Sequence, residues 1–225
     1  AYDNPALSPD GTRIAVAERD GRSSDIWLID VERGSRTRFT SDPDLDLDPI
    51  WSWDGSKILF RSAVGTDLYV KDAGGVQPAA AVVETNAAKI PCDWSPDGRY
   101  LLYAEVDPRT GSDLLVAPAD GSGKPEAVVR SAFEDQQGRF SPDGRWVAFS
   151  SNESGRPEVY VQGFPAAKNR VTISTAGGNN PRWRGDGKEL FFTSANSMVV
   201  VGIDVSSDGV LRASRPLRLF AGPPL

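Results

Sequence analysis

The sequence contains no histidine and only one cysteine, Cys92, among its 225 residues. Without histidine, catalysis by a Ser-His-Asp or Cys-His arrangement is excluded, and with one cysteine so are the usual zinc ligand sets. Cys92 has no second cysteine in this chain to form a disulfide with, and its place in an expected inner strand indicates a small buried hydrophobic side chain. One cysteine does not decide the redox compartment.

Long apolar runs and clusters of basic residues are also missing. No stretch approaches the roughly 18 apolar residues that a membrane-spanning helix needs. The 31 acidic residues outnumber the 25 basic ones, which gives a net charge of −6. We therefore expect no nucleic-acid partner and no membrane insertion. Residues 1–5 lack the regions of a signal peptide and lead directly into a repeat, so we expect the chain to be part of a longer polypeptide.

A five-fold repeat dominates what is present. Its most complete copy is Trp-Ser-Pro-Asp-Gly-Arg at residues 94–99, followed by an apolar run. The aspartate of this motif recurs at positions 10, 54, 97, 143 and 186, in steps of 44, 43, 46 and 43 residues. A period in the forties with strand-like contents is typical of a β-propeller.

The repeated motif has the composition of a hairpin turn. Proline presets φ, aspartate caps its own backbone, and glycine accepts the left-handed conformation that ends the turn. Trp53 and Gly185 replace the proline in two copies, but Asp-Gly is present in all five. We expect the aspartates to form turns rather than to catalyse, and the turn predicts a positive φ at Gly11, Gly55, Gly98, Gly144 and Gly187.

Each repeat contains four short runs rich in β-branched and aromatic residues, separated by turn residues. The sequence therefore predicts one all-β domain over residues 1–225, a β-propeller of four-stranded antiparallel blades. Five repeats lie at about 1–44, 45–86, 87–133, 134–176 and 177–225, either alone or as part of a larger ring. Aromatic residues at one repeat position are expected to pack between adjacent blades; they are Trp51, Trp94, Phe140 and Trp183.

The repeats resemble the WD-like propeller repeats of the TolB type over the whole chain. They are similar in particular to the C-terminal propeller of certain bacterial serine/threonine protein kinases, in the phrases at residues 4–11, 25–28, 67–72, 140–146, 158–162 and 181–184. The kinase motifs themselves are absent from this sequence. The resemblance implies a non-catalytic module that binds a ligand or protein, as the sensor or docking part of such a kinase, in the bacterial periplasm or another extracytoplasmic location.

Two other functions remain open. One is a TolB-like envelope protein that docks other proteins. The other is the gating propeller of a prolyl-oligopeptidase-type hydrolase, in which case the parent polypeptide is an enzyme although this chain carries no recognisable catalytic motif. Unpacked terminal blades would expose apolar surface, so self-association through them is a further expectation.

The ligand site is expected at the mouth of the propeller channel, on loops carried by a rigid scaffold. The connections from the fourth strand to the next first strand, and from the second to the third, share this end of each blade. The predicted ligand-binding residues are Arg61, Lys89, Glu134, Asp135, Asn179, Asn180 and Arg182. The alternative is a solvated rim in which Arg182 forms an ion pair with a loop acid. A glycosidase pair at Glu134 and Asp135 has no support beyond their carboxyl groups.

The densest group of carboxylates spans the end of the first repeat and the start of the second. Alternating aspartates could supply the oxygen ligands that calcium prefers, but the glycine and glutamate of an EF-hand loop are missing. An acidic loop is therefore favoured over a calcium site, and no other cofactor is expected. The four aspartates are Asp42, Asp44, Asp46 and Asp48.

Overall fold

The computed structural model describes residues 2–21, 23–41, 44–62, 66–166, 168–206 and 209–221. Every regular element in these ranges is a β-strand, and no helix there is long and apolar enough to cross a membrane. The chain forms two compact units, one of Ala1–Val106 with Val116–Glu126 and the other of Asp107–Leu115 with Ala127–Leu225.

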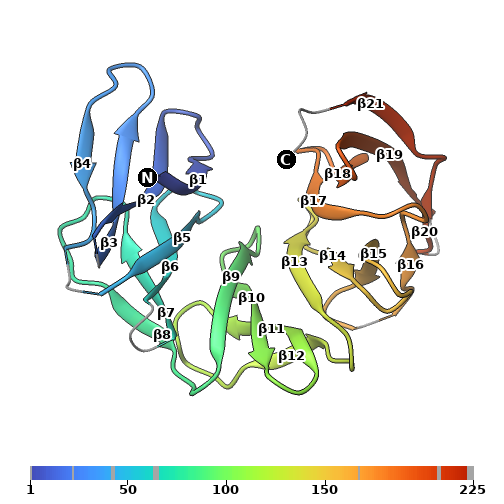
Figure 1. Ribbon diagram of the computed structural model, residues 1–225, viewed down its shortest axis with the longest axis horizontal. Coiled ribbons are helices and arrows are strands. Elements are labelled where there is room, and N and C mark those ends of the chain that lie inside the picture. Colours follow the sequence, from blue (N-terminus) through green and yellow to red (C-terminus); the bar gives the residue numbers. More distant parts are fainter. Residues whose placement is uncertain are drawn as a thin grey trace. The chain divides into compact units, whose positions relative to one another are not determined.

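The first unit contains two complete antiparallel sheets, each a simple meander (Figure 1). The strands of the first sheet are β1 (Tyr2–Leu7), β2 (Arg13–Asp20), β3 (Ser23–Asp30) and β4 (Arg36–Arg38). Those of the second are β5 (Asp46–Trp51), β6 (Lys57–Ser62), β7 (Asp67–Asp72) and β8 (Ala80–Val83). The third sheet, whose residues are divided between the two units, comprises β9 (Ala88–Trp94), β10 (Tyr100–Asp107), β11 (Gly111–Pro118) and β12 (Glu126–Val129).

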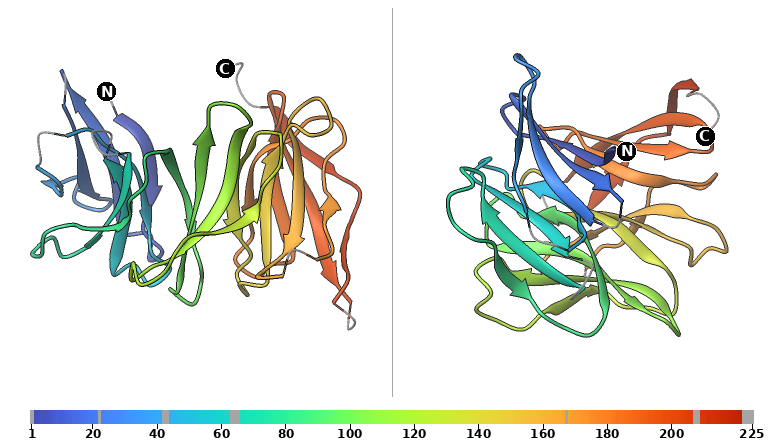
Figure 2. Two further views of the ribbon diagram at one scale, coloured as in Figure 1. Left: turned by 90° about the horizontal axis from the view of Figure 1, so that it is seen from below. Right: turned by 60° about the vertical axis from the view of Figure 1, so that its left-hand side comes forward.

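The second unit contains the last two sheets, which Figure 2 shows from two further sides. The fourth sheet comprises β13 (Asp135–Phe140), β14 (Trp146–Ser151), β15 (Glu158–Gly163) and β16 (Val171–Thr172). The fifth comprises β17 (Asn179–Trp183), β18 (Glu189–Ser194), β19 (Ser197–Val205), β20 (Leu211–Ala213) and β21 (Leu217–Ala221). Both β20 and β21 pair with β19, at opposite ends of that long strand. The predicted all-β fold of antiparallel blades is confirmed, with the predicted four strands in the first four sheets and five strands in the fifth.

The predicted turns are confirmed in all five repeats. The φ angles are 73° at Gly11, 70° at Gly55, 73° at Gly98, 69° at Gly144 and 72° at Gly187. The serine two residues before the aspartate adds a contact that turn propensity alone does not predict.

In the first repeat this serine, Ser8, donates its hydroxyl hydrogen to Asp10 Oδ1 at 2.6 Å and accepts the Arg13 N–H at 2.9 Å. Ser52, Ser95 and Ser141 make the same pair of contacts in their repeats. The hydroxyl group therefore links the turn to the strand that follows it.

Replacing Gly11 by alanine should lower the free energy of unfolding by about 1 kcal/mol, because an alanine there must adopt a left-handed backbone. A β-carbon on Gly11 meets no atom within 4 Å, so backbone strain is the whole cost. Gly74, which is equally open but is not left-handed, is the matched control. Equal losses in urea titrations of the two alanine variants would contradict the turn geometry.

Hydrogen bonds from Ser8 and Thr12 lower the pKa of Asp10 from 3.8 to about 2. A carboxyl group with a lowered pKa stabilises the fold fully above its unfolded pKa and loses that contribution as the pH falls through its folded value. We expect the melting temperature to fall between about pH 4 and pH 2. The Ser8→Ala variant should raise the pKa of Asp10 towards 3.8 in a carboxyl NMR titration; an unchanged pKa would show that the serine is not its main cause.

The core lies between successive sheets. In the first unit, Ala15 and Ile26 of the first sheet pack with Trp51, Ile58 and Phe60 of the second, all at most 6% exposed. In the second unit, Ala148 and Val159 of the fourth sheet are part of one cluster with Leu190 and Phe192 of the fifth, and Trp183 packs against that cluster. The prediction that aromatic residues such as Trp51 and Trp183 pack between blades is confirmed.

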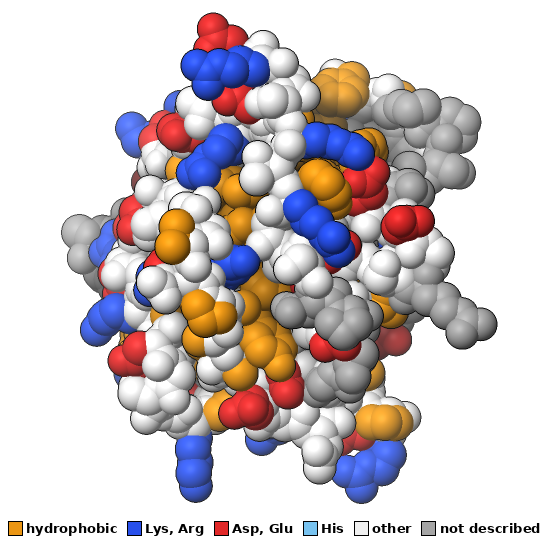
Figure 3. Space-filling view, turned by 90° about the vertical axis from the view of Figure 1, so that its left-hand side faces the viewer, with side chains coloured by type: hydrophobic (Ala, Val, Ile, Leu, Met, Phe, Trp, Pro, Cys, Tyr) orange, Lys and Arg blue, Asp and Glu red, His pale blue; other side chains and the backbone are white. Residues whose placement is uncertain are grey.

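Cationic side chains cover several aromatic rings of the first two sheets. On the side of the molecule that carries these sheets, Lys and Arg side chains lie beside apolar ones (Figure 3). The guanidinium carbon of Arg36 lies 4.7 Å from the ring centroid of Trp27, and Lys71 Nζ lies 4.9 Å from that of Phe39. These contacts shield the half-buried Trp27 ring and the buried Phe39 ring from water.

First strands of the repeats carry a bulge that the sequence analysis did not predict. The register shifts within β1, β5, β13 and β17, and each shift contains one non-glycine residue of positive φ. These residues are Asn4, Asp48, Gln137 and Asn180, with φ angles of 50°, 55°, 59° and 53°. In β9 the shift contains Cys92 instead, which is 4% exposed and so is buried as predicted.

Some apolar side chains at both ends of the chain are exposed. Tyr2 and Leu7 of β1 are 55% and 60% exposed, and Leu217 and Phe220 of β21 are 62% and 60% exposed. Such surface is the basis of the self-association expected through the terminal blades. That expectation stays a prediction.

Candidate binding site

The two predicted ligand-binding residues of the first unit, Lys89 and Arg61, form hydrogen bonds to other groups of the protein. Lys89 is 1% exposed, and its Nζ donates to the carbonyl oxygens of Thr66, Thr85 and Ala87 at 3.0 Å each and to Asp67 Oδ1 at 3.3 Å. These acceptors account for a buried lysine without any ligand.

Arg61, the other predicted residue of this unit, is half-buried. Its Nε donates to the carboxylate of Asp48, which also accepts a hydrogen bond from Asn4 Nδ2. The three side chains connect the first strands of two successive sheets.

Glu134 and Asp135 lie at the start of the fourth sheet but in different environments. Glu134 is exposed, and its N–H donates to Asn152 Oδ1 at 2.9 Å. Asp135 is fully buried, and its Oδ2 accepts the Ser131 hydroxyl at 2.6 Å. Burial raises the pKa of Asp135, opposed by hydrogen bonds and by the Arg170 charge. Two carboxyl groups that differ so much in exposure do not form a pair that faces a common substrate.

Asn179, Asn180 and Arg182 all lie on β17, whereas the two asparagines were expected in the loop before this strand. The Asn180 N–H donates to Gln137 Oε1 of the preceding sheet at 2.8 Å, and its side-chain amide donates to Thr193 Oγ1 at 3.4 Å. The carbonyl oxygen of Asn179 accepts the Thr193 hydroxyl at 3.1 Å. Arg182 is exposed. The structure therefore gives Asn180 a role in joining two sheets, and its role in ligand binding stays a prediction.

An acidic residue near the start of the third strand braces these loops in several repeats. Glu158 is 2% exposed, and its carboxylate accepts hydrogen bonds from the Ser174 hydroxyl, the Gly177 N–H and Arg156 Nε. Asp113 similarly accepts the Ser131 N–H at 3.1 Å and Arg130 Nε at 3.3 Å. The loop that enters the next sheet is thus tied down by charge-assisted hydrogen bonds.

The aspartates considered as calcium ligands that the structure describes have separate environments and do not converge on one point. Asp42 lies outside the described residues. The Asp44 carboxylate accepts the Ser62 hydroxyl at 3.4 Å, Asp46 is 2% exposed, and Asp48 is paired with Arg61. Among the described residues, no group of three or more acidic, cysteine or histidine side chains could hold a metal ion.

We call the boundaries between successive sheets seams. Two seams are built in the same way at the end of the sheets that carries the Asp-Gly turns, where a proline packs against a glycine. At the first seam, between the first and second sheets, Pro9 lies next to Gly55, and a β-carbon on that glycine would lie 3.5 Å from Pro9 Cδ. At the seam between the fourth and fifth sheets, Pro142 lies next to Gly187 in the same way, at 3.7 Å.

A tryptophan of the following sheet closes each of these seams. Trp51 Nε1 donates to the carbonyl oxygen of Ala6 at 2.9 Å, and Trp183 Nε1 donates to that of Arg139 at 3.2 Å.

The seam between the second and third sheets differs in both respects. Trp53 replaces the proline and is 38% exposed, while Gly98 of the third sheet has no neighbour within 4 Å of where a β-carbon would lie. Trp94 donates to the carbonyl oxygen of Gly98 in its own turn, at 3.1 Å, instead of to the preceding sheet. A pocket of about 370 Å³ occupies this place and is named the seam pocket; it is lined by Ser52, Trp53, Asp54, Ser56, Lys57, Trp94, Pro96, Asp97, Gly98, Ala119 and Asp120.

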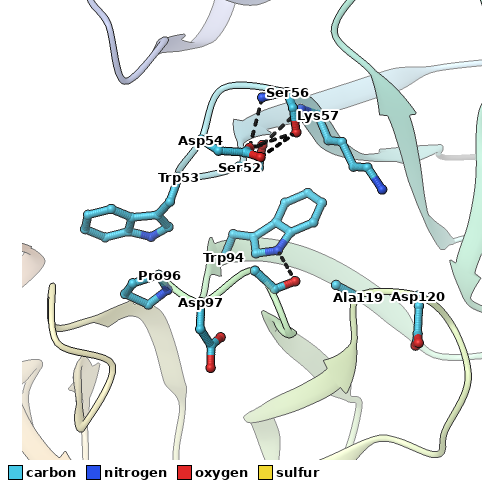
Figure 4. Close-up of a pocket in the computed structure, with 11 residues that line it drawn as sticks. Ser52, Trp53, Asp54, Ser56, Lys57, Trp94, Pro96, Asp97, Ala119 and Asp120 are labelled. Carbon is cyan, nitrogen blue, oxygen red and sulfur yellow. Dashed lines mark hydrogen bonds between the residues drawn. The ribbon is translucent and has the colours of Figure 1, made fainter.

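The seam pocket combines an aromatic wall with charged groups. In Figure 4 the Trp53 ring stands over Pro96, Trp94 lies between Trp53 and Lys57 in this view, and the Lys57 amine points away from Asp54. Trp94 is only 3% exposed and so forms the floor. Among the described residues, Lys57 Nζ makes no hydrogen bond or ion pair.

The carboxyl groups of the pocket are stabilised in their charged form. Hydrogen bonds from Ser52 and Ser56 lower the pKa of Asp54 to about 2, and those from Ser122 lower the pKa of Asp120. Burial alone would raise the pKa of Asp97, but hydrogen bonds from its own turn outweigh it and lower the pKa. Asp97 is paired with Arg99 at 2.6 Å, so at neutral pH the remaining carboxylates of Asp54 and Asp120 and the ammonium group of Lys57 give the pocket a net charge of −1.

The seam pocket was not predicted from the sequence, although one signal for it is present there. Trp53 breaks the Ser-Pro-Asp-Gly pattern at the position where a bulky side chain is not needed for the turn. We treated that substitution only as a tolerated variation, because a turn motif by itself does not show what its proline contacts in the neighbouring repeat.

The sequence of the chain matches the model of a protein family described as the TolB beta propeller domain, over residues 2–137 and 65–214. The chain belongs to the TolB β-propeller family. Its fold is similar to that of TolB from Acinetobacter baumannii, with a TM-score of 0.71 and 21% identity over 99% of this chain and 55% of that chain. The TolB part of the predicted resemblance is confirmed, and the kinase part stays a prediction.

Two curated relatives match parts of the chain. It is 39% identical over 44 residues to the Tol-Pal system protein TolB of Anaeromyxobacter dehalogenans, which is 20% of this chain and 10% of that protein. It is 30% identical over 108 residues to the uncharacterized peptidase YuxL of Bacillus subtilis, which is 44% of this chain and 16% of that protein. The chain thus spans only a small part of the length of these relatives.

Proposed function

We propose that this chain is a non-catalytic module that docks a segment of another protein in the seam pocket. One observation carries the proposal: the pocket opens at the seam where an exposed tryptophan, Trp53, replaces the proline that closes two other seams. An exposed aromatic ring beside charged groups on a rigid scaffold is a typical anchor for protein recognition.

The surroundings of the pocket support binding rather than catalysis. The carboxylates of the turns are held by their own serine and backbone donors, so they remain charged acceptors rather than groups that exchange protons near neutral pH. The match to a TolB protein of a Tol-Pal system supports a docking role in the bacterial periplasm. The sensor or docking part of a bacterial serine/threonine kinase is the more specific form of this proposal.

A second candidate is the gating propeller of a peptidase, which the 30% identity to YuxL favours. The sequence of the parent polypeptide separates the two. A Gly-x-Ser-x-Gly hydrolase after this propeller would favour the peptidase, whereas a kinase and a membrane span before it would favour the sensor.

A peptide selection tests the docking function. Random peptides displayed on phage are selected on the chain, and the enriched peptides are measured again on the Trp53→Pro variant, which restores the turn sequence of the other repeats. We expect enriched peptides that lose at least tenfold in affinity for Trp53→Pro and keep their affinity for Val31→Ala, which removes an exposed apolar residue outside the pocket. Enrichment of no peptides, or equal binding to all three proteins, would refute the proposal.

A further inference from the structure

At the first seam, Arg13 of the chain itself occupies the position that corresponds to the seam pocket. At the first seam, the guanidinium carbon of Arg13 lies 4.7 Å from the ring centroid of Trp51, and its NH1 donates to the carbonyl oxygen of Ala73 at 3.3 Å. The arginine of one sheet therefore fills the space between the tryptophan and the outer turn of the next sheet.

The seam pocket holds the equivalent positions of the next seam. Lys57 follows its turn aspartate by three residues as Arg13 does, and Trp94 corresponds to Trp51. Ala119 corresponds to Ala73, because the N–H of each donates to the carbonyl oxygen just before the second strand of its sheet, at 2.8 Å. The shorter lysine has one donor nitrogen and no planar group, and this seam retains an open pocket.

We propose that the seam pocket takes the side chain of an arginine carried by a partner protein. This inference rests on the docking function proposed above and names the chemistry of the partner. The guanidinium group would donate to the carbonyl oxygen of Ala119 and the carboxylate of Asp120, and Trp53 would cover its apolar stem.

Charge supports an arginine over an acidic ligand. Asp97 is paired with Arg99, which leaves the carboxylates of Asp54 and Asp120 against the single ammonium group of Lys57, so the pocket attracts a cation. A planar guanidinium also matches a pocket with an aromatic wall better than a second lysine does. An acidic peptide bound to Lys57 is the opposite case, and substitution of Lys57 distinguishes the two.

The probe is N-acetyl-arginine amide, titrated against the intact chain and followed by the amide NMR shifts of Gly98 and Asp120. A ligand of this size should half-saturate the pocket on the order of 1 mM. N-acetyl-citrulline amide, which is neutral and nearly the same shape, should bind at least tenfold more weakly.

Two substitutions of Lys57 should act in opposite directions. Lys57→Arg should abolish binding, because the new guanidinium occupies the pocket as Arg13 does at the first seam. Lys57→Met removes a like charge and should strengthen binding roughly fivefold. Lys124→Arg and Lys124→Met, at an exposed lysine outside the pocket, are the matched controls and should change nothing.

Each outcome bears on one of the two proposals. Failure of the arginine probe to bind, equal binding of citrulline, or loss of binding in Lys57→Met would overturn the arginine inference. If the phage selection enriches peptides without arginine that still depend on Trp53, the docking function stands and only the arginine inference falls.

Discussion

Replacing Lys89 by methionine should lower the free energy of unfolding by about 3 kcal/mol. The methionine keeps most of the apolar stem but leaves three carbonyl oxygens and the Asp67 carboxylate without their buried donor. Removal of one partner from a buried polar network costs this much because the remaining groups cannot regain water. Urea denaturation followed by far-ultraviolet circular dichroism measures the loss.

Lys124→Met is the control, because Lys124 is exposed and lies in the same unit. It should change the stability by less than about 0.5 kcal/mol. If Lys89→Met were equally harmless, the lysine would not hold this loop in solution, and its predicted role as a ligand-binding residue would regain support.

Replacing Glu158 by alanine should also destabilise the chain by about 3 kcal/mol. Its buried carboxylate joins Arg156, Ser174 and Gly177, and the alanine leaves the hydroxyl and N–H donors of the loop unpaired. Glu158→Gln keeps one acceptor oxygen and the side-chain size, so it should cost less than the alanine variant. Exposed Glu126→Ala serves as the control.

The effect of Glu158→Gln should depend on pH. Burial alone would raise the pKa of Glu158, but the hydrogen bonds from Ser174, Gly177 and Arg156 outweigh it and lower the pKa below 4.5. The stabilisation by the charged group is present above about pH 4.5 and is lost as the pH falls through the lower folded value. The stability difference between wild type and Glu158→Gln should therefore shrink in acid; a constant difference from pH 7 to pH 3 would contradict this role of the charge.

The repeated turn made most of the fold predictable from sequence. Asp-Gly recurs with a nearly constant period, and a glycine such as Gly98 leaves few turn types open, so strand positions and the antiparallel order follow from local chemistry. The aromatic residue before four of the five turns, as at Trp51, also predicted where the core between blades lies. These features depend on contacts that repeat from one blade to the next.

The features that were missed depend on contacts between different repeats. Asn4 and Asp48 adopt left-handed backbones at bulges, yet neither is a glycine, so sequence pattern gave no signal. Lys89 looked like an accessible loop residue because two of its four acceptors, Thr66 and Asp67, lie 23 and 22 residues earlier in the sequence. The other two, Thr85 and Ala87, belong to the segment just before it. The sequence shows that Trp53 replaces the turn proline. It does not show that, as a result, no described residue of the second sheet packs against Gly98 of the third, which is seen only in the structure.

A crystal structure of the chain grown with N-acetyl-arginine amide tests the central claim most directly. We expect an open seam between the second and third sheets, with the guanidinium group hydrogen-bonded to the carbonyl oxygen of Ala119 and its stem against Trp53. This expectation would be contradicted by a seam in which Lys57 itself fills the space between Trp94 and Ala119 and the probe is absent.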